Sequence, residues 1–96
     1  MVPSLEEENK IAFITCIEIV LMRRGNINYN LVLAKLQAQF FCGMDDCLDH
    51  PEYLKSILKE VYTHDYNAVL DEISLETDRL MDIDKIKADF FKFMKS

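Results

Sequence analysis

Hydrophobic residues are distributed along the chain in segments whose spacing predicts α-helices. The first of these segments, Ile11 to Met22, carries Glu18 as its only charged residue. A helix that is apolar on nearly every side has to be enclosed by protein or by lipid. Because a helix that crosses a bilayer needs about 20 apolar residues, this shorter run indicates a buried core helix. We therefore predict that it forms the centre of a small all-α domain.

Both ends of this first helix are marked in the sequence. Ser4 and Glu7 have the spacing of a capping box, in which each side chain accepts a hydrogen bond from the other residue's backbone N–H. Arg23 and Arg24 place positive charge at the carboxyl end, which the helix dipole favours. Gly25 follows and can adopt the positive φ that commonly ends a helix. The sequence therefore predicts a helix from Ser4 to Arg24.

A second helix is expected from Tyr29 to Phe41, after a turn at residues 26–28 in which Asn28 is the N-cap. Its apolar residues cover a broad arc, and Gly43 is expected to end it. The irregular stretch that follows is rich in aspartate and cysteine.

The third helix is expected to begin at Pro51, because a proline at the first helical position loses no hydrogen bond. Asp49 and Glu52 form a second pair with capping-box character. Apolar residues then recur with helical period as far as about Thr63, namely at Leu54, Ile57, Leu58, Val61 and Tyr62.

Two more amphipathic stretches complete the chain. Asp65 is a plausible cap for the fourth, whose stripe is Tyr66, Val69, Leu70, Ile73, Leu80 and Met81. Asp82 or Asp84 begins the fifth, whose stripe is Ile83, Ile86, Phe90, Phe93 and Met94. Neither glycine nor proline separates the two, so they could also form one long helix bent near Met81. We predict a single domain over residues 1–96, a compact all-α bundle of four to five helices around a buried first helix.

Composition supports this architecture and excludes several classes of function. Hydrophobic residues make up 50% of the chain, and its 2 glycines and 2 prolines suit helices joined by short loops. The net charge of −6 repels phosphate backbones, so nucleic-acid binding is not expected. The acidic amino-terminal segment lacks the basic n-region of a signal peptide, and the cysteine count is odd. We therefore expect reduced thiols, a cytoplasmic location and no membrane segment.

The loop that follows the second helix holds the main candidate for metal chemistry. Cys42, Cys47 and His50 are zinc's preferred ligand types, but a structural zinc needs four ligands. An aspartate of the same loop could supply the fourth. Two alternatives are a redox switch between the two thiols, and a purely structural role for half-buried thiols beside a histidine. We expect no cofactor, with zinc as the alternative.

Aromatic residues point instead to protein binding. Phe90, Phe91 and Phe93 cannot all face inward from one helix, because successive residues are rotated by about 100°. At least one of them, with Phe91 as the first candidate, is exposed or covered by a partner, unless the terminal helix lies in a groove. Together with Phe40 and Phe41 they form the predicted partner-binding set, and a homodimer is the expected assembly.

Catalytic motifs are lacking in the sequence. With Gly25 and Gly43 as its only glycines, the chain has no glycine-rich phosphate loop. No nucleophile is accompanied by a recognisable base and orienting group. We therefore expect that the protein is not an enzyme.

A resemblance to a known family rests on short motifs between Ile11 and Met81. These motifs are Leu21-Met-Arg-Arg-Gly25, Tyr29, Leu36, His50-Pro-Glu-Tyr-Leu54 and Leu58-Lys-Glu-Val-Tyr62. In them the chain resembles a family of small all-helical archaeal domains that occur alone or as output modules of signalling proteins. The resemblance implies a noncatalytic signalling or regulatory module, and it implies no site residues.

Overall fold

A computed structural model describes residues 5–80 and 83–95, and it confirms the all-α prediction. Within these residues there is no β-strand, and no helix is both long enough and apolar enough to cross a bilayer. The elements are α1 (Leu5–Arg24), α2 (Asn26–Phe40), η1 (Met44–Asp46), α3 (Pro51–Tyr62), η2 (Thr63–Asp65), α4 (Tyr66–Thr77) and α5 (Asp84–Met94). The predicted Ser4–Glu7 capping box, the bend near Met81 and the Asp82 cap involve positions outside the described residues.

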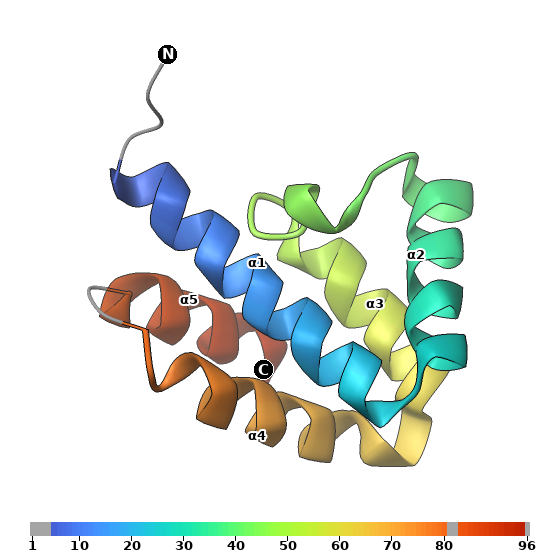
Figure 1. Ribbon diagram of the computed structural model, residues 1–96. Coiled ribbons are helices and arrows are strands. Elements are labelled where there is room, and N and C mark those ends of the chain that lie inside the picture. The colour runs from blue at the N-terminus through green and yellow to red at the C-terminus, as the bar shows by residue number, and fades with distance from the viewer. Residues whose placement is uncertain (1–4, 81–82, 96) are drawn as a thin grey trace.

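Helix α1 runs diagonally across the front of the bundle in Figure 1, with α4 below it and α2 rising from its carboxyl end, and it packs against both. Its inward side chains Phe13, Ile17 and Leu21 are fully buried. Its outward stripe is exposed, at Ile11, Ile19 and Met22. The expectation that this helix is enclosed on nearly every side is therefore too strong, because within residues 5–80 and 83–95 no later helix covers its outer face. The expectation that it forms the central element of the core is confirmed.

A single residue, Gly25, joins α1 to α2. Its φ of 139° and ψ of 126° turn the chain sharply, and the N–H of Tyr29 already donates to the Gly25 carbonyl at 3.1 Å. The predicted turn at residues 26–28 is wrong, because these residues form the first turn of α2. Asn28 is accordingly not an N-cap. Glycine alone can take this backbone conformation without strain. Gly25 by itself therefore forms the connection that was expected to need residues 25–28.

The other end of α2 also differs from the prediction. Phe41 is the C-cap in the left-handed conformation, with φ 54°, and its N–H donates to the Gln37 carbonyl at 3.2 Å. The helix therefore ends before Gly43. A left-handed aromatic residue costs roughly 1–2 kcal/mol of strain.

The remaining boundaries follow the predicted stripes with small shifts. Pro51 does open α3, but His50 is its N-cap and makes no side-chain cap bond, so the predicted Asp49 cap is wrong. Helix α4 ends at Thr77, before the predicted Leu80. Helices α4 and α5 are separate elements rather than one bent helix, because the described residues 78–80 after α4 are not helical (Figure 1).

Helix α5 is held on the bundle by contacts to three other helices. The Phe90 ring meets the Phe13 ring of α1 edge to face, with centroids 5.1 Å apart. The Tyr66 hydroxyl of α4 donates to the Met94 carbonyl at 2.7 Å. Lys55 of α3 donates to the Phe93 carbonyl at 3.2 Å. Through these contacts α5, the last helix, packs into the same core as α1, the first.

A partly buried hydrogen bond between α1 and α2 predicts a loss of stability at alkaline pH. The Tyr29 hydroxyl donates to the Glu18 carboxylate, and this bond raises the pKa of Tyr29 from 10.0 to about 12. When the pKa of a phenol is higher in the folded protein than in the unfolded chain, the phenol contributes its full stabilisation of the fold at any pH below the unfolded-state pKa. That stabilisation is lost as pH rises through the folded pKa. We expect urea titrations to show the free energy of unfolding falling between about pH 10 and 12.

The variant Tyr29→Phe should weaken this pH dependence without abolishing it. Burial also raises the pKa of Tyr66 to about 12, so part of the alkaline loss remains in the variant. An unchanged slope in Tyr29→Phe would mean that the Glu18 bond does not form in solution.

Candidate functional site

The structure brings the two loop cysteines together but turns the histidine away. Cys42 and Cys47 are buried beside η1, and the Cys47 thiol donates to the Gly43 carbonyl at 3.7 Å. His50 is exposed, and its Nδ1 lies 3.3 Å from a Glu52 carboxylate oxygen. Its ring stacks on Tyr53 at a centroid distance of 4.9 Å. In the described part of the chain, no three cysteine, histidine or acidic side chains form a group that could hold a metal ion.

The electrostatics of this loop disfavour thiolate chemistry. Burial, followed by the neighbouring Cys42 and the acidic loop, raises the pKa of Cys47 to about 12. Burial and the carboxylates of Asp46 and Asp45 also raise the pKa of Cys42. Because the thiolate is both the nucleophile and the metal ligand, these protonated thiols suit packing. Zinc binding and a redox switch at this loop stay predictions.

Thiol labelling tests this assignment. All three cysteines, Cys16, Cys42 and Cys47, are free and buried, so a chromogenic disulfide reagent at neutral pH should react with the native protein slowly. Addition of denaturant should release all three thiols at the rate of an ordinary exposed cysteine. Rapid labelling of Cys42 or Cys47 in the native state would contradict a packing role for these thiols and would favour the redox switch.

The aromatic residues expected to bind a partner divide into structural and exposed members. Phe40 stacks on Tyr53 at 4.3 Å and ties the end of α2 to the start of α3. Phe90 is 4% exposed and belongs to the core, so it cannot contribute to an interface. Phe91 is partly buried, with its ring 6.4 Å from that of Phe13. The exposed members are Phe93, below the Lys55 ammonium, and Phe41.

The outward face of α2 is the feature that the sequence analysis missed. Its exposed apolar residues Ile27, Leu31, Ala34 and Ala38 follow one another at spacings of four, three and four, and the C-cap Phe41 is exposed directly beyond them. We call these five residues the α2 seam. Ile27 is 85% exposed and Phe41 is 84% exposed. The helix buries its opposite side, at Val32 and Leu36. Helix α2 is therefore apolar on two faces, and the described part of the chain covers one of them.

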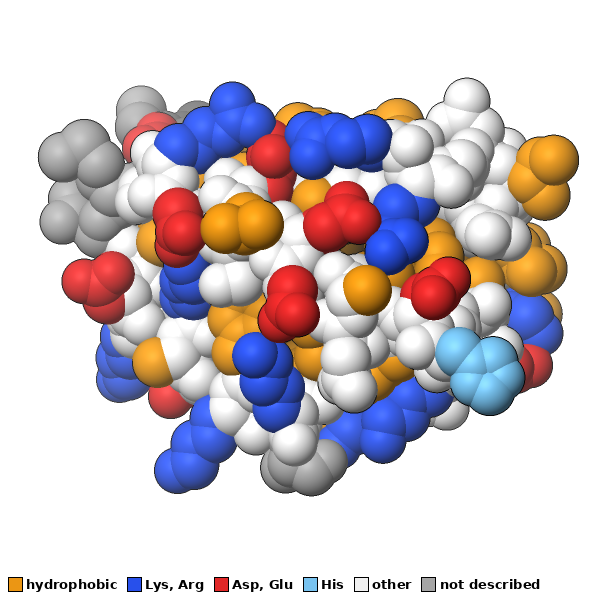
Figure 2. Space-filling view, turned by 90° about the horizontal axis from the view of Figure 1, so that it is seen from below, with side chains coloured by type: hydrophobic (Ala, Val, Ile, Leu, Met, Phe, Trp, Pro, Cys, Tyr) orange, Lys and Arg blue, Asp and Glu red, His pale blue; other side chains and the backbone are white. Residues whose placement is uncertain are grey.

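Charge is nearly absent around the seam. Lys35 is the only charged residue of α2, and its ammonium is paired with Glu60 of α3 at 2.6 Å. The exposed residues that flank the seam are amides: Asn28, Asn30, Gln37 and Gln39. Figure 2 shows the face seen from below, where acidic and basic side chains are interspersed with hydrophobic atoms, and further hydrophobic atoms lie at the right margin, on the side of α2.

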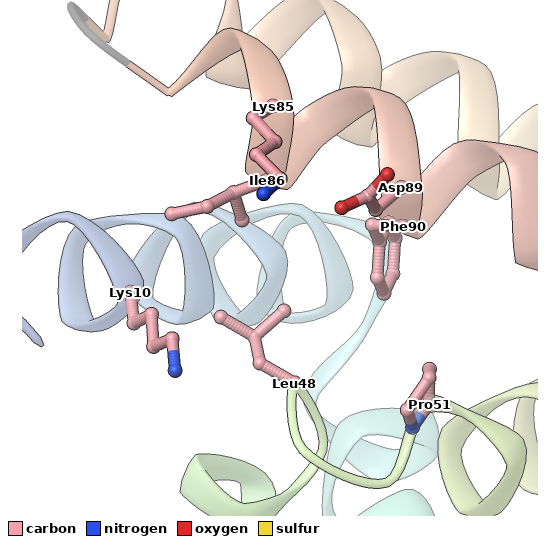
Figure 3. Close-up of a pocket in the computed structure, with 7 residues that line it drawn as sticks. All are labelled: Lys10, Leu48, Pro51, Lys85, Ile86, Asp89 and Phe90. Atoms are coloured by element: carbon pink, nitrogen blue, oxygen red, sulfur yellow. The ribbon is translucent and has the colours of Figure 1, made fainter. Parts of the chain in front are cut away.

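A cavity of about 310 Å³ lies on the other side of the bundle, between α1, α5 and the loop before α3 (Figure 3). Its lining is mixed: Lys10, Leu48, Pro51, Lys85, Ile86, Asp89 and Phe90. Among these described residues there is no cysteine or histidine, and Asp89 is the only carboxylate. Such a lining offers neither an activated nucleophile nor a pair of acid and base groups. The cavity therefore suggests no catalytic chemistry.

Comparisons with protein-family models, with curated proteins and with solved structures found no match to this chain. The resemblance to small archaeal helical domains therefore stays a prediction. Function has to be argued from the surface of this chain alone.

Proposed function

We propose that this protein is a noncatalytic interaction module that binds another protein chain through the α2 seam. The observation that supports this proposal is the continuous exposure of apolar side chains at Ile27, Leu31 and Phe41, with alanines between them. Single exposed hydrophobic residues are ordinary, but a contiguous apolar row with a polar rim is typical of a protein-binding surface.

The pattern of the seam also favours a helical partner. Apolar residues that alternate at spacings of four and three are those that insert between the side chains of a facing helix. Uncharged amides at the rim keep the surface hydrated in the free protein, and they can be covered without stranding a charge. A regulatory role in the cytoplasm, without a cofactor, is the cellular setting that we propose for this module.

Site-specific photo-crosslinking in the native host tests this function. A photoreactive phenylalanine analogue at Ile27 should give an adduct of defined mass, and mass spectrometry should identify its second component. The same analogue at Leu75 of α4, which is 71% exposed, is the matched control and should give none. The adduct should disappear when Leu31→Glu is introduced. Absence of any specific adduct at position 27 would overturn the proposal.

A further inference from the structure

We propose that the partner of the α2 seam is a second copy of this chain, with the two α2 helices packed antiparallel. This inference rests on the proposed function and names the partner for that same surface. Three properties of the seam support it: its charge, the sizes of its side chains and its symmetry.

The charge argument comes from the contrast between α2 and the rest of the protein. The chain carries a net charge of −6, so two copies repel each other over most orientations. Helix α2 contributes no acidic residue, and Glu60 already neutralises its one lysine, Lys35. Contact through α2 therefore places no acidic side chain of this helix in the interface, and the Glu60 carboxylate beside it is already paired with Lys35. A partner with a basic docking helix would find no carboxylate on α2 itself.

The side-chain sizes favour an antiparallel arrangement. In a parallel pair, Leu31 would face Leu31 and Ala38 would face Ala38, so the large side chains would meet each other and the small ones would leave a gap. In an antiparallel pair centred at Ala34, Leu31 of each copy lies near Ala38 of the other and fills the space beside it. Ile27 of each copy then lies near Phe41, the C-cap of the other α2. The pairing is self-complementary, as two-fold symmetry requires.

The extent of the seam predicts a modest affinity. Helix α2 has 15 residues, which makes it about 22 Å long. One helix pair of that length covers less surface than a standard stable interface, so we expect a dimer with micromolar dissociation constant.

Sedimentation equilibrium of the purified full chain tests the dimer. The wild type should show a reversible monomer–dimer equilibrium. Leu31→Glu and Ala34→Glu should each weaken association by about thirtyfold or more, because each buries an unpaired charge at the centre of the seam. Ala34 is exposed, and glutamate is a good helix former, so Ala34→Glu should leave the fold intact. Leu75→Glu changes the same charge on α4 and should leave the dissociation constant unchanged.

Engineered cysteines test the antiparallel arrangement. Ala34→Cys lies at the two-fold axis and should form an interchain disulfide on oxidation. Ile27→Cys should not, because the two copies of position 27 are about 20 Å apart in this arrangement. The native thiols are buried and should not interfere. A disulfide in Ile27→Cys would overturn the antiparallel pairing.

The outcomes separate this inference from the proposed function. A wild type that stays monomeric at millimolar concentration, or a dimer that survives both α2 variants, would overturn the inference. The proposed function would still stand if the photo-adduct at position 27 contained a different protein. Loss of both the dimer and the adduct would overturn both.

Discussion

Phe13→Ala should lower the free energy of unfolding by about 3–5 kcal/mol, the usual loss when a buried aromatic ring is removed. Phe13 is fully buried, and its ring contacts Phe90 at 5.1 Å and Phe91 at 6.4 Å. It therefore links α1 to α5 through two aromatic contacts. A domain of this size has about 5–15 kcal/mol of stability in total, so the variant should be close to unfolding. Chemical denaturation followed by circular dichroism measures the change.

Ile11→Ala is the matched control for this prediction. Ile11 lies on the same helix but is 61% exposed, so its truncation should change the free energy of unfolding by less than about 1 kcal/mol. Equal losses in the two variants would contradict the orientation of α1, and with it the packing of the bundle.

Gly25→Ala should lower the free energy of unfolding by about 1–3 kcal/mol, through backbone strain alone. At φ 139° a side chain is strained whatever the space around it, and a Cβ built on Gly25 would meet no atom within 4 Å. The loss should therefore come without a steric clash. Its structural consequence should be fraying at the junction of α1 and α2, measurable as faster amide exchange at Tyr29.

Gly43→Ala provides the comparison. Gly43 has an ordinary φ of −103°, and a Cβ there would press only on the flexible Asp45 side chain, at 2.9 Å. We expect a loss well below that of Gly25→Ala. A larger loss at Gly43 would show that the loop, and not the Gly25 junction, is the tighter turn.

Local signals in the sequence were sufficient for most of the fold. Helical periodicity identified every α-helix, and Gly25 and Pro51 marked two boundaries because each imposes a backbone constraint that does not depend on neighbours. The Asn28 and Asp49 caps failed for the opposite reason. A residue with capping chemistry is used only if the chain turns at that point, and the chain turns instead at Gly25 before α2 and at His50 before α3.

The candidate site could not be predicted from the sequence, because it depends on how the helices pack against one another and on where α2 begins. Helical geometry showed that the three phenylalanines of α5 could not all be buried, but which of them is exposed depends on how α5 meets Phe13 and Lys55. The α2 seam was concealed by the assumed turn, which left Ile27 out of the helix. The spacing of Ile27, Leu31, Ala34 and Ala38, together with a single charged residue in α2, was the signal that could have revealed it.

The account depends most on the claim that the α2 seam pairs with a second copy of this chain, and nuclear magnetic resonance on an isotopically labelled full chain tests it residue by residue. Amide shifts recorded through a dilution series should change at Ile27, Leu31, Ala34 and Ala38, while those of α4 and α5 stay constant. Concentration-independent shifts along α2, or changes centred instead on Phe93 or on the cavity beside Lys10, would contradict it.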